Sequence, residues 1–152
     1  MSWALRLTLV AATFTAASGT CLSSEWRPFR SMCYWPSDYA LTWTDAKTIC
    51  PAMFPGSTLV SIHDLDLDAF IAENVFDIDR RAWLGLSRNS SSDPWVWTDG
   101  STYDFSHWFG GDPGCPGSYE CCAAINWQAI GDWSGFDCYD TYSYFMCQLD
   151  AS

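Results

Sequence analysis

Positive charge and long apolar segments are both scarce in this sequence. Lysine and arginine together number 7 among 152 residues, against 18 aspartates and glutamates, so the formal net charge is −11. Most of such a surface repels phosphate groups, which argues against nucleic acids and anionic membranes as partners. After the N-terminal segment, no apolar run approaches the ~20 residues of a membrane-spanning helix, so no membrane insertion is expected.

The one extended apolar run lies at the N-terminus. Arg6 precedes it, and small residues between Ala16 and Gly19 end it. A basic start, a short apolar core and small residues form the pattern of a secretory signal peptide. We therefore predict a signal peptide over residues 1–19, a single domain over residues 20–152, and a secreted, extracellular product.

Zinc-type cysteine spacing is also missing. The cysteines are Cys21, Cys33, Cys50, Cys115, Cys121, Cys122, Cys138 and Cys147. No two of them are separated by a two-residue gap, and His63 and His107 lie far from the clustered cysteines in sequence, which argues against a zinc site. An even number of cysteines in an exported chain instead predicts a disulfide framework. The sequence alone permits many pairings, and the roles of Cys121 and Cys122 are interchangeable at this point.

The first helical signal begins at Thr42. Together with Asp45 three residues later, Thr42 forms a pattern typical of a capping box and predicts a helix that ends at about Met53. The residues at helical spacing within it are Trp43, Ala46, Lys47 and Cys50. This spacing predicts one face of the helix packed against the rest of the domain.

A second helix is predicted from about Asp64 to Phe76. Its buried stripe consists of Leu67, Phe70, Ile71 and Val75. Asp64, Asp66 and Asp68 crowd its first turns, where the helix dipole favours negative charge. His63 is expected to help cap the same end.

After the second helix the pattern changes to short strands and loops. The predicted strands are Ala82–Leu86, Trp95–Trp97, Ala123–Asn126 and Tyr144–Gln148. Asp99-Gly100 predicts a tight turn after the second of these strands. Helices early and strands late predict an α+β fold. Asn89, in the sequence Asn-Ser-Ser, is a candidate N-glycosylation site.

Several short motifs follow one another in an order that a known family shares. They are Cys21 with Cys33-Tyr34, Trp43-Thr44-Asp45-Ala46 through Cys50, Leu59-Val60-Ser61-Ile62, Trp83-Leu84-Gly85-Leu86, Trp97-Thr98-Asp99-Gly100, His107-Trp108, Gly131-Asp132-Trp133, Cys138 and Phe145-Met146-Cys147. In this order and register the sequence resembles a C-type lectin-like domain of the long, secreted, single-domain form. The resemblance implies two helices, small antiparallel sheets and a long disulfide-braced loop region.

The resemblance also implies a disulfide pairing. Three of the pairs follow the family pattern and the fourth uses the two remaining cysteines: Cys21–Cys33, Cys50–Cys147, Cys122–Cys138 and Cys115–Cys121. The last pair would clip the long loop onto itself. Bridges of this kind each stabilise a small domain by about 2–4 kcal/mol, mainly by restricting the unfolded chain.

Sugar-binding members of the family hold one Ca²⁺ ion with an acid-Pro-Asn triplet, a second acid and the Asn-Asp of a Trp-Asn-Asp motif. Asp112-Pro113-Gly114 stands at the triplet here, and Pro113 is consistent with the cis peptide that the family uses there. Glu120 stands at the second acid. Ser134 and Gly135 replace the Asn and Asp after Trp133. Ca²⁺ prefers six to eight oxygen ligands, so this ligand set is incomplete.

The resemblance therefore implies a ligand-binding region in the second half of the domain. Its candidate residues are Asp112, Pro113, Gly114, Glu120, Trp127, Ser134 and Gly135. Asp112 and Glu120 are the candidate Ca²⁺ ligands, with Asp132 and Asp137 as substitutes for the missing oxygens. At the family's auxiliary calcium site the oxygen ligands are replaced by Arg88, Cys115 and Cys121.

Aromatic residues make up 17% of the chain, and ten residues are tryptophan. This aromatic content is higher than an ordinary core of this size needs. Trp83, Trp97 and Trp108 are expected in the core. Trp127, Tyr139 and Tyr142 lie in or near the loop region. They are candidates either for stacking on a ligand or for packing.

The resemblance implies a secreted carbohydrate-binding protein of defence or adhesion, with glycans or glycoproteins as partners and Ca²⁺ as the candidate cofactor. The alternative is a lectin-like domain that binds a protein or a mineral or ice surface, which the loss of the Asn and Asp ligands favours. No enzyme is expected, because neither His63 nor His107 lies in a nucleophile motif.

Overall fold

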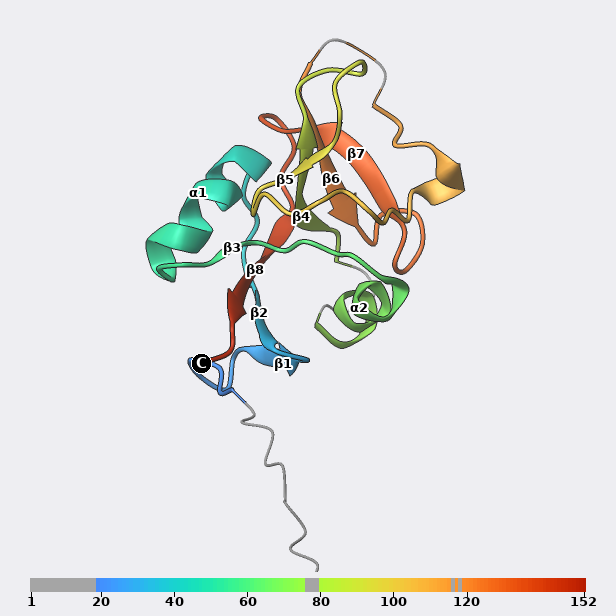
Figure 1. Ribbon diagram of the computed structural model, residues 1–152. Helices are drawn as coiled ribbons and strands as arrows, with labels where there is room; N and C mark the ends of the chain where they lie inside the picture. Colours follow the sequence, from blue (N-terminus) through green and yellow to red (C-terminus); the bar gives the residue numbers. More distant parts are fainter. Residues whose placement is uncertain (1–18, 76–79, 116, 118) are drawn as a thin grey trace, which may run out of the picture.

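The computed structural model describes residues 19–75, 80–115, 117 and 119–152 (Figure 1). The predicted signal peptide, apart from Gly19, lies outside these residues, as does Phe76 at the predicted end of the second helix. The two ends of the described chain lie side by side, because the backbone N–H of Thr20 donates to the carbonyl of Ser152 at 2.8 Å.

The fold is α+β, as predicted, but its strands form one mixed sheet rather than the small antiparallel sheets that the resemblance implied. The strands are β1 (Arg27–Phe29), β2 (Met32–Pro36), β3 (Thr58–Leu59), β4 (Ala82–Arg88), β5 (Val96–Trp97), β6 (Cys121–Ile125), β7 (Trp133–Asp137) and β8 (Tyr144–Asp150). The main path runs β1-β2-β8-β4-β6-β7, with β3 paired to β8 and β5 paired to β4. The β4–β8 pair is parallel and the other pairs are antiparallel. The strands β1, β2, β3 and β7 are not among the predicted strands. In β7, Ser134 and Gly135 interrupt the apolar alternation.

The first helix, α1, spans Trp43–Met53, as predicted. Its cap is Thr42, whose hydroxyl accepts a hydrogen bond from the N–H of Asp45 at 3.3 Å. Trp43, Ala46 and Cys50 are buried, whereas Lys47 is exposed and places its ammonium group 5.2 Å from the centre of the Trp43 ring.

The second helix, α2, spans Leu65–Phe70 and continues as a π-helical segment over Ile71–Val75. Its cap is Asp64, whose carboxylate accepts from the N–H of Leu67 at 2.9 Å. The expected capping role of His63 is wrong: its Nδ1 lies 2.7 Å from the Asp104 carboxylate instead. The cap position is taken by Asp64, and the imidazole of His63 pairs with an acid outside the helix.

The two helices lie on either side of the central strands (Figure 1). Each packs on one of two apolar clusters. Leu67 of α2 and Ile71 of the π-helical segment pack into the cluster that contains Leu84 and Trp133. Trp43 and Cys50 of α1 belong to the other cluster, with Trp83 and Phe145. Strand β4 supplies both clusters with alternate residues, so all of its residues but the last are buried.

Four disulfides join the cysteines in the pairs that the resemblance implies: Cys21–Cys33, Cys50–Cys147, Cys115–Cys121 and Cys122–Cys138. Cys50–Cys147 ties α1 to β8, and Cys122–Cys138 joins β6 to the segment after β7. No described helix is both long enough and apolar enough to cross a membrane.

Candidate functional site

The long loop, residues 112–120, leaves a short 3₁₀ turn at Phe109–Gly111 and leads into β6. Besides its own disulfide, two hydrogen bonds fasten it to the sheet. The N–H of Gly135 in β7 donates to the carbonyl of Pro113 at 2.7 Å, and the guanidinium of Arg88 in β4 donates to the carbonyl of Cys115 at 3.2 Å. Arg88, which stands at a position of the auxiliary calcium site, therefore holds the loop directly.

Gly135 lies directly beneath the Cys115–Cys121 disulfide. A Cβ atom at position 135 would lie 2.6 Å from Sγ of Cys121, 2.9 Å from Sγ of Cys115 and 2.9 Å from the carbonyl oxygen of Pro113. Real Cβ atoms essentially never approach other atoms so closely, so only glycine fits here without a shift of the loop. The disulfide and the Pro113 carbonyl together therefore require glycine at this position.

The two acids of the long loop are used locally. The carboxylate of Asp112 accepts from the N–H of Gly114 at 2.9 Å, which closes a small turn around Pro113. The peptide bond before Pro113 is trans, because the described residues contain no cis peptide bond, so the expected cis geometry is wrong. At the other end of the loop, the hydroxyl of Tyr139 donates to the Glu120 carboxylate at 2.6 Å. This hydrogen bond raises the pKa of Tyr139.

The two substitute acids do not face the long loop as ligands. Asp137 accepts from the backbone N–H groups of Tyr139 and Asp140 at 2.8 and 2.9 Å, and thereby shapes the turn after β7. Asp132 lies 3.4 Å from Nε2 of His107. Each carboxylate thus has a structural partner of its own.

Asp68 was predicted to interact with the dipole of the second helix. Its carboxylate is instead buried against Trp133 and His107, next to the loop region. The side chain of Asp68 in α2 is 1% exposed; it accepts from Nε1 of Trp133 at 2.6 Å and lies 2.8 Å from Nδ1 of His107. Burial raises the pKa of Asp68. Burial also acts to lower the pKa of His107, but the hydrogen bond and attraction to Asp68 outweigh it and raise that pKa.

The sequence did contain a signal for this role of Asp68. It lies four residues after the cap Asp64 and three before Ile71, so it belongs to the same helical stripe as Leu67. An acid on a buried stripe requires a hydrogen-bonding partner, and here Trp133 supplies it.

Aromatic side chains are exposed beside β7. Trp127, in the turn between β6 and β7, is 52% exposed, and Tyr139 and Tyr142 are also exposed. The guanidinium of Arg81 lies 4.8 Å from the centre of the Trp127 ring and 4.4 Å from that of Phe136. Arg81 in turn donates to the Ser143 hydroxyl at 2.6 Å and to the Tyr142 carbonyl at 2.8 Å, so the Trp127 ring rests on a fixed support.

The tryptophans expected in the core are placed there with one exception. Trp83 and Trp97 are buried at 0% and 3% exposure. Trp108 is only half-buried and packs edge-on against Trp133, with its Nε1 donating to the Tyr103 hydroxyl at 2.9 Å. It lies over the core because the chain there turns outward into the long loop.

A comparison with protein families assigns the chain to a family. Residues 39–149 match the family model described as the Lectin C-type domain, which is most of the chain. The chain belongs to the C-type lectin domain family. A curated C-type lectin-like relative, Lectin BRA-3 of Megabalanus rosa, is 30% identical over 148 residues, which cover 96% of this chain and 89% of the relative.

Solved C-type lectin structures share the fold. The carbohydrate-recognition domain of cow CD23, solved in the presence of a GlcNAc2Man3 oligosaccharide, superposes with a TM-score of 0.75 at 26% identity and covers 88% of this chain and 98% of that one. A calcium-independent type II antifreeze protein superposes with a TM-score of 0.75 at 22% identity, over 90% of this chain and 99% of the other, and shows the likeness of fold alone. C-type lectin domains are binding domains rather than enzymes.

The residues at the C-type lectin calcium positions of this chain do not fit the ion. Gly114 and Gly135 carry no side-chain oxygen, and Glu120 is engaged with Tyr139. Among the described residues, Glu120 does lie within 4.8 Å of two further metal-binding types of side chain, Cys122 and Cys138. Those two sulfurs are bonded to each other, so the group offers a single carboxylate. These positions offer too few oxygen ligands for Ca²⁺, which prefers six to eight.

Proposed function

We propose that this C-type lectin domain is a secreted carbohydrate-recognition protein that binds glycans or glycoproteins through the long loop, β7 and Trp127. The observation that carries the proposal is the fastening of the long loop: the disulfide Cys115–Cys121 rests on Gly135, and Gly135 bonds Pro113. Export is supported by the cysteines, all of which are paired within the described residues.

The described part of the loop around Pro113 and Cys115 is held by covalent and hydrogen bonds in place of a metal ion. In a lectin that depends on calcium, the ion both holds the loop and contacts the sugar hydroxyls. Here the disulfide and the hydrogen bonds from Arg88 and Gly135 take over the first of these tasks. A loop that is fixed before binding loses less conformational entropy when the ligand arrives. We therefore propose binding that does not need Ca²⁺.

The sugar contacts would come from Asp112, Glu120 and Trp127. The carboxylates accept hydrogen bonds from sugar hydroxyls, and an exposed indole ring offers an apolar face for the C–H groups of a pyranose. Trp127 is suited to this, since Arg81 already fixes its ring. Ser134 adds a partly exposed hydroxyl on β7 beside Gly135.

A glycan array probed with the disulfide-bonded domain, once with Ca²⁺ and once with a chelator, tests the proposal. Equal glycan signals in both conditions are expected. Asp112→Ala and Trp127→Ala should each weaken the signal, whereas Asp140→Ala, which removes an exposed acid of the neighbouring turn, should leave it unchanged. A signal that the chelator abolishes would refute the calcium-free mechanism but retain the sugar site.

The second candidate function is binding of a protein or a mineral or ice surface without any sugar site. Glycines at two positions that carry ligands in sugar-binding relatives favour it, since Gly114 and Gly135 offer no polar side chain. An array with no glycan signal under either condition, together with retained folding, would support this function. Assays of ice-crystal growth and of adsorption to a calcium mineral would then distinguish binding to ice, to mineral and to a protein.

A further inference from the structure

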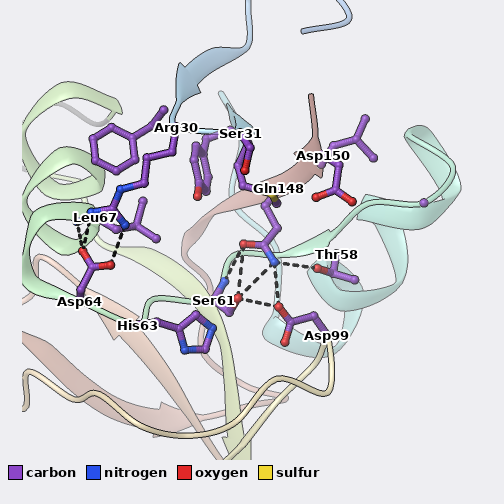
Figure 2. Close-up of a pocket in the computed structure, with 15 residues that line it drawn as sticks. Arg30, Ser31, Thr58, Ser61, His63, Asp64, Leu67, Asp99, Gln148 and Asp150 are labelled. Carbon is purple, nitrogen blue, oxygen red and sulfur yellow. Dashed lines mark hydrogen bonds and ion pairs between the residues drawn. The ribbon is translucent and has the colours of Figure 1, made fainter. Parts of the chain in front are cut away.

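A pocket of about 540 Å³ opens between the β1–β2 hairpin, the start of α2 and the end of β8 (Figure 2). None of the residues that line it belongs to the long loop or to β7. Its volume lies within the ~300–1,000 Å³ of pockets that bind small molecules. The pocket is therefore separate from the proposed glycan site.

The wall of the pocket includes the hydroxyl group of a buried tyrosine, which is open to the pocket and has no hydrogen-bond partner in the described part of the protein. Tyr34 lines the pocket and is 2% exposed, yet its hydroxyl forms no hydrogen bond with any described residue. Burial raises the pKa of Tyr34 to about 12, so the hydroxyl stays protonated. Buried polar groups nearly always have a hydrogen-bonding partner, and for Tyr34 only a ligand in the pocket or solvent can supply it.

A fixed carboxylate lies on the other side of the pocket. Asp99 accepts hydrogen bonds from the Ser61 hydroxyl at 2.6 Å and from the Gln148 amide at 2.9 Å, as Figure 2 shows. Ser61 and Gln148 are 6% and 7% exposed, so this part of the wall is built into the core. Burial would raise the pKa of Asp99, but hydrogen bonds from Ser101 and Ser61 outweigh it and lower that pKa. Asp99 therefore carries a negative charge.

The remaining charges of the pocket leave its lining negative. The guanidinium of Arg30 forms an ion pair with Asp64 at 2.6 Å, and both line the pocket. Asp150 also lines it, and its carboxylate has no hydrogen-bond or ion-pair partner among the described residues. Asp99 and Asp150 thus remain without a cationic partner, in a chain whose net charge is already −11.

Two other classes of ligand fit this lining less well. The Phe29 ring is covered by Phe70, stacked at 4.4 Å, and by the guanidinium of Arg30 at 4.9 Å, so it offers little face to a sugar ring. Among the described residues, the pocket carboxylates form no group of three within 4.8 Å, the kind of cluster that would favour a single metal ion. An extended cation matches charges that are spread over the walls.

We propose that this pocket binds the primary ammonium group of a small alkylamine. The ammonium group would pair with the carboxylate of Asp150 or of Asp99, the two acids of the lining without a cationic partner, and the hydroxyl of Tyr34 would offer it a further hydrogen-bond acceptor. The alkyl chain would lie along Leu67 and Leu149, which also line the pocket. The same ammonium chemistry can come from a free amine or from a lysine side chain of a peptide.

Titration of the disulfide-bonded domain with putrescine, followed by NMR chemical shifts at low salt, tests the proposal. Saturable shifts of the residues lining the pocket are expected, and the uncharged isostere 1,4-butanediol should bind about tenfold more weakly or worse. Asp150→Asn should weaken putrescine binding about fivefold, since it removes one partly exposed ion pair. Tyr34→Phe, which keeps the ring, should weaken it about threefold or more. A lysine tetrapeptide that binds more tightly than putrescine would assign the amine to a protein partner.

The control is Asp38→Asn, which makes the same charge change at an exposed site outside the lining and should leave the affinity unchanged. Equal binding of butanediol and putrescine would overturn the proposal. So would an unchanged affinity of Asp150→Asn in a domain whose NMR spectrum shows the native fold. Glycan binding should be unaffected by Asp150→Asn, so failure at the pocket and failure at the long loop are told apart.

Discussion

Gly135 leaves no room for a side chain beside Cys121: a Cβ atom at position 135 would lie 2.6 Å from the Cys121 sulfur. In the sugar-binding pattern that this sequence resembles, the same position carries an acid that binds Ca²⁺. The acid and the Cys115–Cys121 disulfide therefore exclude each other sterically.

Gly135→Ala should destabilise the domain by about 1–3 kcal/mol, the usual cost of forcing a methyl group into a packed site. Urea unfolding of the disulfide-bonded protein measures the difference. The matched control is the same change in a Cys115→Ala/Cys121→Ala background. Part of the penalty should disappear there because the sulfurs are gone, although the Pro113 carbonyl remains 2.9 Å away. An equal penalty in both backgrounds would show that the disulfide is not what requires glycine.

Trp133→Phe should cost more than a change of ring size alone. It leaves the carboxylate of Asp68, which is buried, without its donor at 2.6 Å, and loss of a hydrogen bond to a buried charge costs about 1.5–3 kcal/mol. Trp97→Phe is the control: Trp97 is also buried, but its Nε1 has no hydrogen-bond partner among the described residues. Unfolding free energies of the two variants give the comparison. Equal losses would mean that the bond to Asp68 contributes nothing beyond packing.

The pairing of His107 with Asp68 should make stability depend on pH. The folded-state pKa of His107 is raised, so its contribution is fully present below the unfolded-state pKa of about 6.5 and is lost as pH rises through the folded-state value. The stability difference between the wild type and His107→Gln should therefore be larger at about pH 5.5 than at about pH 8.5. Unfolding curves at the two pH values measure it.

The pH effect requires Asp68, so Asp68→Asn is the background that checks it. Asp132, which lies 3.4 Å from Nε2 of His107, remains in that background. Most of the pH dependence of the His107→Gln effect should vanish there. If it stays as large as in the wild type, Asp132 rather than Asp68 sets the pKa of His107.

Arg81→Lys should weaken the support of Trp127 even though it keeps the charge. The planar guanidinium contacts two rings and donates to Ser143 and Tyr142, a geometry that an ammonium group does not reproduce. A loss of about 1–2 kcal/mol in unfolding free energy is expected, together with weaker glycan binding. Arg27→Lys is the control, since exposed Arg27 makes one hydrogen bond, to the Ser24 carbonyl. Similar losses in both variants would exclude a specific role for Arg81.

The local signals along the chain were sufficient for both helices and for the strands β4, β5, β6 and β8. The Thr42 cap, the stripe of Leu67 and Ile71 and the apolar run of β4 act over a few residues, so periodicity and capping chemistry reveal them. The order of motifs then implied the family and the pairing of the cysteines. The strand β7 was not predicted because it contains the small residues Ser134 and Gly135. Gly135 is set by its contact with the Cys115–Cys121 disulfide, which a local pattern does not reveal.

The candidate site depended on contacts between residues distant in sequence, which no local pattern carries. Asp68 became the partner of Trp133, 65 positions away, only because α2 packs against β7. Tyr34, Asp99 and Asp150 meet in one pocket because β2, the turn after β5 and β8 lie together in the folded chain. The sequence by itself determined which elements form and which family they build. Tertiary packing decided which polar groups are buried together, since burial and proximity arise only when the elements assemble.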